Sequence, residues 1–171
     1  MKLPYLKTYL HLQFPHSSDR KLEEMIRQLK ESEKCHFTQD GFHVVKEYGR
    51  IDVFTLSEKG YEYRFTSLRQ MKKKDYGSFS LSETGGPLEG VTLSEDDFPL
   101  LVRNAREKDF ISMRYGRRKL NRFFIDAKIP LRKRLTWPVM LNGKGDVILV
   151  PGIGCDRMHY SEKHNMFMIE L

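Results

Sequence analysis

The apolar positions near the amino terminus follow the period of a helix. Four of them have the i, i+3, i+4, i+7 spacing that gathers side chains on one buried face: Leu22, Met25, Ile26 and Leu29. Polar residues 17–19 supply N-caps in front of them. The pattern therefore predicts a helix that ends near Glu33. Residues 3–14 predict a shorter helix, which Pro15 stops.

Alternating apolar and polar residues, typical of strands, come next. Residues 41–46 and 50–56 alternate in this way, and Tyr48-Gly49 provides a turn between them. Residues 61–65 predict a third strand. We therefore expect a small α+β domain over residues 1–66, followed by a strand-rich connection over residues 67–97.

The last part of the chain, residues 98–171, predicts short strands around one helix. Strands are expected at residues 98–103 and 166–171, and a hairpin is expected over residues 139–150, with a Gly-containing turn. Residues 119–128 carry an apolar stripe at helical spacing, in which Phe123 and Phe124 are interpreted as core. The predicted fold class is α+β: the small α+β domain precedes a β-rich, sandwich-like domain with one or two short helices.

Charge adds a functional expectation to this outline. The 171-residue chain has a net charge of +7 and a pI near 9.4, and residues 101–140 hold 12 Lys or Arg against 3 Asp or Glu. Concentrated positive charge is typical of proteins that bind a polyanion, although a solvated basic face is an open alternative. The residues predicted to contact RNA phosphates are Arg114, Arg117, Arg118, Lys119, Arg122, Arg132, Lys133 and Arg134.

Other classes of protein are disfavoured by what the sequence lacks. It has no apolar run long enough to span a membrane, no signal-peptide pattern and no GxxxxGK[ST] loop. Cys35 and Cys155 lie far apart, and the six histidines have no metal-ligand spacing. Gly152-Ile153-Gly154 is interpreted as a turn. No catalytic residue, metal or cofactor is predicted for this chain, and the cytoplasm is the expected location.

A longer motif points to a family. Residues 119–130, KLNRFFIDAKIP, resemble the KLxxFFIDxKIP signature in the C-terminal domain of bacterial tRNA(Ile)-lysidine synthetases. The resemblance continues through Arg134, Trp137-Pro138-Val139 and residues 148–153, and it includes residues 98–103 upstream. Residues 46–50 give a shorter match to the domain that precedes it in the family. One departure is Lys108-Asp109, where the family usually has Gly-Asp, so the tight turn is expected to differ there.

The resemblance implies a part of an enzyme. The family uses ATP, with magnesium, to activate the wobble cytidine of an isoleucine tRNA with a CAU anticodon and attaches lysine to it. A separate nucleotide-binding domain performs that chemistry, and the C-terminal domains hold the tRNA body. We therefore expect a tRNA-binding fragment of an ATP-dependent ligase. The alternatives left open are a protein-interaction or scaffolding domain, a homodimer, and a free-standing enzyme with an unrecognised site.

Overall fold

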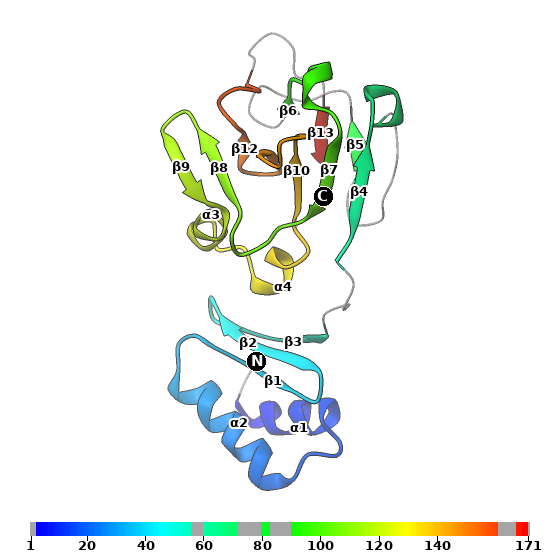
Figure 1. Cartoon of the computed structure of the whole chain (residues 1–171). Helices are drawn as coiled ribbons and strands as arrows, with labels where there is room; N and C mark the ends of the chain where they lie inside the picture. Colours follow the sequence, from blue (N-terminus) through cyan, green and yellow to red (C-terminus); the bar gives the residue numbers. More distant parts are fainter. Residues whose placement is uncertain (1–2, 56–59, 72–79, 83–89, 161–166, 171) are drawn as a thin grey trace. The chain divides into compact units, whose positions relative to one another are not determined.

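The protein divides into two compact units, each described here by itself. The computed structural model describes residues 3–55, 60–71, 80–82, 90–160 and 167–170 (Figure 1). Contacts between Cα atoms group Met1–Glu58 with Pro130–Arg132 as unit 1. Unit 2 comprises Lys59–Ile129 and Lys133–Leu171.

Unit 1 consists of two helices and a three-stranded antiparallel sheet of order β1-β2-β3. Its elements are α1 (Leu3–Gln13), α2 (Asp19–Glu31), β1 (Cys35–Gln39), β2 (Phe42–Glu47) and β3 (Arg50–Thr55). Both predicted helices and the predicted strand pair are confirmed. The sequence analysis did not predict β1, which pairs with β2 along its whole length.

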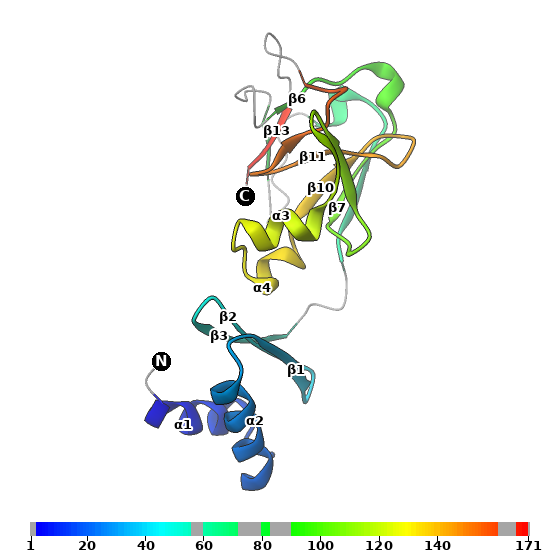
Figure 2. The ribbon, with the colours of Figure 1, turned by 90° about the vertical axis from the view of Figure 1, so that its left-hand side faces the viewer.

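The helices of unit 1 cover one face of its sheet (Figure 2). The expected apolar face of α2 is buried through Leu22, Met25 and Leu29. These side chains form one cluster with the buried residues of α1 and with Val44 of β2. The ring of Phe14, just past α1, meets Phe42 edge-on at 5.5 Å between centroids. Unit 1 thus has a hydrophobic core of its own.

Unit 2 is built on a seven-stranded sheet of order β4-β7-β10-β11-β8-β9, with β12 paired to β11. Its pairs are antiparallel except β8 with β11, so the sheet is mixed. A second sheet has the order β5-β13-β6. The strands are β4 (Glu62–Phe65), β5 (Ser80–Ser82), β6 (Gly90–Val91), β7 (Leu100–Asn104), β8 (Phe110–Met113), β9 (Gly116–Lys119), β10 (Pro138–Leu141), β11 (Val147–Val150), β12 (Gly154–Cys155) and β13 (Phe167–Glu170). The helical pieces are α3 (Leu120–Asp126), the 3-10 turns η1 (Leu68–Met71) and η2 (Glu95–Asp97), and α4 (Leu131–Arg134), whose first two residues group with unit 1.

The central strands of the large sheet are covered on both faces. All four residues of β10 and all four of β11 are buried. On one face Met140 and Ile148 pack in a cluster with Val91 of β6. On the other, Val139 packs in a cluster with Leu120 and Phe124 of α3. The α+β class is therefore confirmed, with the large sheet lying between β6 and α3.

Several predicted elements of unit 2 form as expected. The hairpin is β10 and β11, the helix is α3, and strands form at β7 and β13. Trp137 is half-buried against the α3 cluster, and its indole N–H donates to the carbonyl of Pro151 at 3.0 Å. Trp137 therefore contributes to the packing of unit 2.

Two expectations about the chain's organisation need correction. The strand expected at residues 61–65 forms as β4, but it pairs with β7 and so belongs to the sheet of unit 2. Residues 67–97 were expected to form a connection, yet their described residues contribute η1, β5, β6 and η2 to unit 2. The first unit therefore ends before β4 rather than at residue 66. Pairing between distant strands overrides the local pattern here.

No helix in the described ranges is long and apolar enough to cross a membrane.

Candidate nucleic-acid interface

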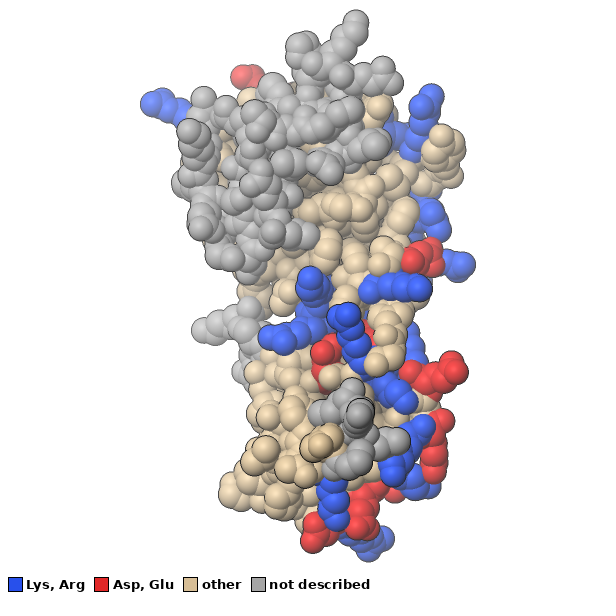
Figure 3. Space-filling model, turned by 180° about the vertical axis from the view of Figure 1, so that it is seen from behind, with Lys and Arg blue, Asp and Glu red and all other residues tan. Residues whose placement is uncertain are grey.

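The basic residues of the sequence cluster lie on a two-stranded hairpin at one edge of the large sheet. β8 and β9 pair as far as Met113 opposite Gly116, so Arg114 and Tyr115 form the turn between them. Gly116 has φ +115°, a backbone conformation that side-chain-bearing residues rarely adopt. All four residues of β9 are exposed. In the view from behind, Lys and Arg side chains project along the edge of unit 2 that carries this hairpin (Figure 3).

Alternation along β9 divides its cations between two faces. The guanidinium carbon of Arg118 lies 4.5 Å from the ring centroid of Phe123 on α3. The Arg117 guanidinium lies 4.6 Å from the ring of Phe110, and the Lys119 ammonium 5.8 Å from the same ring. Successive strand residues point to opposite faces, so the sequence cluster becomes a ribbon with positive charge on both faces. Cation–π contacts hold these side chains extended without neutralising them.

The remaining predicted phosphate contacts differ in how accessible they are. Arg114 is exposed in the hairpin turn, and Arg122 is exposed on α3. Lys133 on α4 is also exposed. Arg132 is exposed too, but its contacts group it with unit 1. Arg118 has an acidic neighbour, Asp126, at 3.5 Å, and both side chains are about half exposed. Such a surface pair is weak enough to yield to a phosphate.

Arg134 departs from the prediction. It is 7% exposed, and its Nη1 donates to the side-chain oxygen of Asn121 at 3.4 Å. A guanidinium held among protein groups in this way supports packing and is withdrawn from the surface. Arg134 was predicted to contact phosphate together with Arg132 and Lys133, because their positions along the chain give no information on burial. We therefore remove it from the set of phosphate contacts.

The turn that precedes β8 forms despite Lys108. The carboxylate of Asp109 accepts a hydrogen bond from the backbone N–H of Arg106 at 2.7 Å, and the N–H of Asp109 donates to the carbonyl of Arg106 at 3.0 Å. Lys108 is not among the residues with positive φ, so glycine is not required at that position. The same carboxylate takes two hydrogen bonds of 2.8 Å from the buried guanidinium of Arg103. This ion pair anchors the base of the β8–β9 hairpin to β7.

A cavity of about 620 Å³ lies beside the hairpin, and we call it the β9 hollow. Its lining includes Met113, Arg114, Tyr115, Arg118, Phe123 and Tyr160. Cys155 and Asp156 also contribute, and burial raises the pKa of the Cys155 thiol, which keeps it protonated. The walls are therefore largely apolar and aromatic, with arginines among them.

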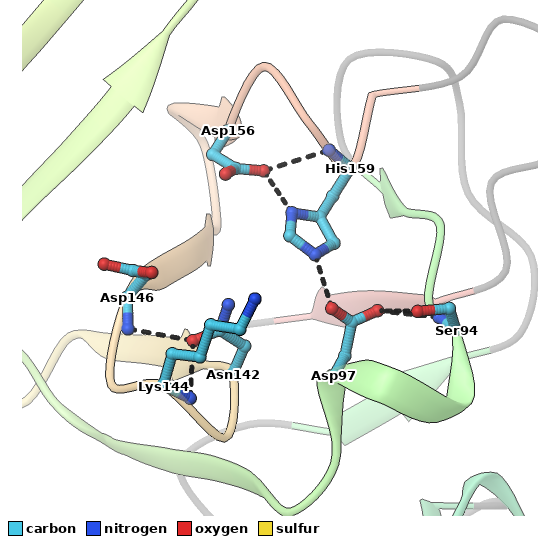
Figure 4. Close-up of polar contacts among 7 residues, drawn as sticks. All are labelled: Ser94, Asp97, Asn142, Lys144, Asp146, Asp156 and His159. Atoms are coloured by element: carbon cyan, nitrogen blue, oxygen red, sulfur yellow. Dashed lines mark hydrogen bonds and ion pairs between the residues drawn. The ribbon is translucent and has the colours of Figure 1, made fainter.

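A half-buried histidine, His159, joins two carboxylates in unit 2 (Figure 4). Nε2 of His159 lies 2.8 Å from Asp97 on η2, and Nδ1 bonds to Asp156, which follows β12. Asp97 also accepts hydrogen bonds from the backbone N–H and the hydroxyl of Ser94, which caps η2. The sequence analysis did not predict this cluster, because Asp97 and His159 lie 62 residues apart along the chain.

In the Asp97–His159–Asp156 cluster a positively charged histidine lies between two carboxylates, an arrangement that stabilises the fold. The hydrogen bond to Asp156 is the main cause that raises the pKa of His159 to about 9, with Asp97 adding to it against the cost of burial. Burial pushes the pKa of Asp97 upward, but hydrogen bonds from His159 and Ser94 lower it overall. Both ring nitrogens are engaged and the ring is protonated at neutral pH, so His159 cannot serve as a general base.

Comparisons with known proteins find a family match within the second unit. Residues 100–170 match the family described as the TilS substrate C-terminal domain. The tRNA(Ile)-lysidine synthases of Bacillus licheniformis and Bacillus subtilis are 38% and 36% identical over 58 residues, 33% of this chain. The bifunctional protein TilS/HprT of Listeria innocua is 40% identical over 78 residues, 43% of this chain. Each of these alignments spans only 12% of the relative's own length.

A solved structure is also similar. The crystal structure of a TilS C-terminal domain has 22% sequence identity and a TM-score of 0.45, and covers 65% of this chain and 94% of that chain. The family match contains the KLNRFFIDAKIP motif and the basic hairpin within its 71 residues. Residues 100–170 of the chain thus match the TilS substrate C-terminal domain family, and segments of 58 to 78 residues are similar to tRNA(Ile)-lysidine synthases and to a TilS/HprT protein.

Proposed function

We propose that unit 2 binds tRNA as a non-catalytic part of a tRNA(Ile)-lysidine synthase. The observation that carries the proposal is the exposed β8–β9 edge, whose cations lie on both faces of a ribbon within the family domain. The relatives that share this domain are tRNA(Ile)-lysidine synthases by name. A basic surface in a protein that acts on RNA is most simply a contact for its phosphates.

The arrangement of the cations favours contact with the RNA backbone. Arginine offers a planar fork of donors that fits phosphate oxygens, and such contacts position a nucleic acid without reading its sequence. An A-form stem has a deep, narrow major groove that side chains cannot read, so shape and backbone contacts dominate its recognition. Arg114, Arg117, Arg118 and Lys119 would thus hold a tRNA stem by charge and shape.

The finer parts of the proposal concern the whole enzyme. The tRNA would be the isoleucine tRNA with a CAU anticodon, and lysine would be joined to its wobble cytidine at the expense of ATP, with magnesium. That chemistry belongs to a catalytic domain other than the two units described here. The reaction would take place in the cytoplasm, where tRNA is modified.

The test is fluorescence anisotropy of the 171-residue chain with that isoleucine tRNA and with a methionine tRNA, at two salt concentrations. We expect binding that weakens as salt rises, because phosphate contacts release counterions. Preference for the isoleucine tRNA would support a role in specificity, whereas equal binding would leave a docking surface that does not discriminate.

Substitutions on β9 test whether this strand contacts the RNA. Arg117→Ala and Arg118→Ala should each weaken binding to both tRNAs. Arg64→Ala is the matched control, because Arg64 is exposed on β4, at the opposite end of the same sheet. Binding that ignores both salt and the β9 variants would contradict the proposal. Absence of RNA binding together with tight self-association would favour a protein-interaction domain instead.

A further inference from the structure

We infer that the β9 hollow receives one unpaired nucleotide of the bound RNA, at the end of a helix whose backbone lies along β9. This inference rests on the proposed function and adds a second kind of contact to it. The cavity of about 620 Å³ lies within the range of roughly 300–1,000 Å³ typical of pockets for small organic groups. Charge on β9 accounts for binding a backbone, but it does not account for an aromatic cavity beside that charge.

The aromatic side chains of the hollow are placed for stacking. Tyr115 stands in the hairpin turn with 93% of its surface exposed, and Tyr160 is 41% exposed. A tyrosine in a two-residue turn gains no burial from the fold, and serine, asparagine or glycine would suit the turn better. Phe123 forms a further wall and is covered by the Arg118 guanidinium. Aromatic rings and arginine planes are the groups on which unpaired bases stack.

The charges around the hollow fit a nucleotide better than an apolar ligand. Arg114, Arg118 and Arg157 all line it, so a phosphate next to a stacked base would meet cations. Among the described residues of the lining the one acid is Asp156, which is 6% exposed and is bonded to protonated His159. Its negative charge is therefore already balanced within the fold. The hollow presents apolar walls and positive charge, which match the two halves of a nucleotide.

Only an unpaired nucleotide can enter. In a duplex the base faces are stacked on their neighbours, and extruding one costs a few kcal/mol. A nucleotide beyond the last base pair has little stacking to lose. The adjoining helix would keep its phosphates on the β9 cations, which border the hollow through Arg118. One ligand would thus span the charged edge and the aromatic cavity together.

The experiment compares two RNA hairpins with the same stem, one blunt and one with a single-stranded 3′ extension, each labelled at the loop. Binding to the 171-residue chain is measured by fluorescence anisotropy. We expect the extension to lower Kd by roughly 5- to 150-fold, which is the equivalent of about 1–3 kcal/mol for one stacked base. Equal affinity for the two hairpins would overturn the inference while leaving the proposed function in place. No binding to either would refute both.

Variants then assign the effect to the hollow. Tyr115→Ala should remove most of the advantage of the extension and leave affinity for the blunt hairpin unchanged, whereas Tyr115→Phe, which keeps the ring, should restore it. Met158→Ala is the matched control, because Met158 is 74% exposed and lies outside the lining of the hollow. If Tyr115→Ala lowers affinity for both hairpins equally, the base does not enter the hollow. If it instead abolishes self-association of the chain, the hollow serves a second copy, and the inference fails.

Discussion

Replacing Asp109 with alanine tests whether the buried ion pair at the base of the β8–β9 hairpin holds unit 2 together. The side chains of Arg103 and Asp109 are 6% and 10% exposed, and two hydrogen bonds of 2.8 Å join them. After the substitution Arg103 keeps, among the described residues, one acceptor, the carbonyl of Asn104 at 2.8 Å, but no counter-charge. We therefore expect the variant to leave an uncompensated cation in the interior.

The expected loss of stability follows from leaving the Arg103 guanidinium without its carboxylate partner. Removing one partner of a buried ion pair typically destabilises a protein by about 3–5 kcal/mol. The backbone N–H of Arg106 loses its acceptor as well, but Arg106 is exposed and water can replace the lost bond. The free energy of unfolding of unit 2 should thus fall by about 3–5 kcal/mol, most of it from the stranded guanidinium.

Urea unfolding followed by tryptophan fluorescence measures this change. Trp137 is the sole tryptophan of the chain and packs in the core of unit 2, so its emission reports that unit. Asp126→Ala is the matched control, because it removes a half-exposed ion pair and should cost less than about 1 kcal/mol. The double variant Arg103→Met, Asp109→Leu should recover much of the loss, since an apolar pair needs no counter-charge. A loss of under about 1 kcal/mol for Asp109→Ala would refute the reasoning.

Three further predictions concern other charged groups. His159→Gln should lower the free energy of unfolding by up to about 3 kcal/mol below pH 6.5. The difference from wild type should vanish as pH rises through about 9, because the fold favours only the protonated ring of His159. Urea unfolding across that range checks it, and a difference independent of pH would contradict it. Arg118→Ala should make the salt dependence of RNA affinity shallower by about 0.9 in the log–log slope, measured by anisotropy; an unchanged slope would mean no phosphate contact. Arg134→Ala should instead lower the free energy of unfolding, measured in urea, by about 1–3 kcal/mol and leave the salt dependence of RNA affinity unchanged. A shallower salt dependence would mean that Arg134 does contact a phosphate.

Local patterns predicted the elements that bury a regular apolar face. The spacing of Leu22, Met25 and Leu29 was sufficient for α2, because those side chains alone make its buried stripe. The hairpin of β10 and β11 was predicted in the same way. Its turn is held as expected of an Asn-Gly sequence, with the side chain of Asn142 accepting hydrogen bonds from Lys144 and Asp146.

Elements held by distant partners were missed. β9 reads Gly116-Arg117-Arg118-Lys119, without a single apolar side chain, and it is a strand only because β8 pairs with it. The membership of β4 depends on its pairing with β7, and the cluster around His159 depends on η2 lying beside the chain that follows β12. The burial of Arg134 has the same origin. Sequence spacing predicted the concentration of charge correctly, but not which cations reach the surface.

The position of β9 has a consequence for how copies of this chain meet. β9 is the last strand in the order of the large sheet, so along the described strands it offers an unpaired edge. An exposed edge is a template for pairing with another molecule, and charged side chains are a common protection against it. If two copies paired antiparallel through β9, arginine would face arginine, and like charges directly opposite are destabilising. The charge of this edge therefore disfavours the joining of a second copy into a continuous sheet.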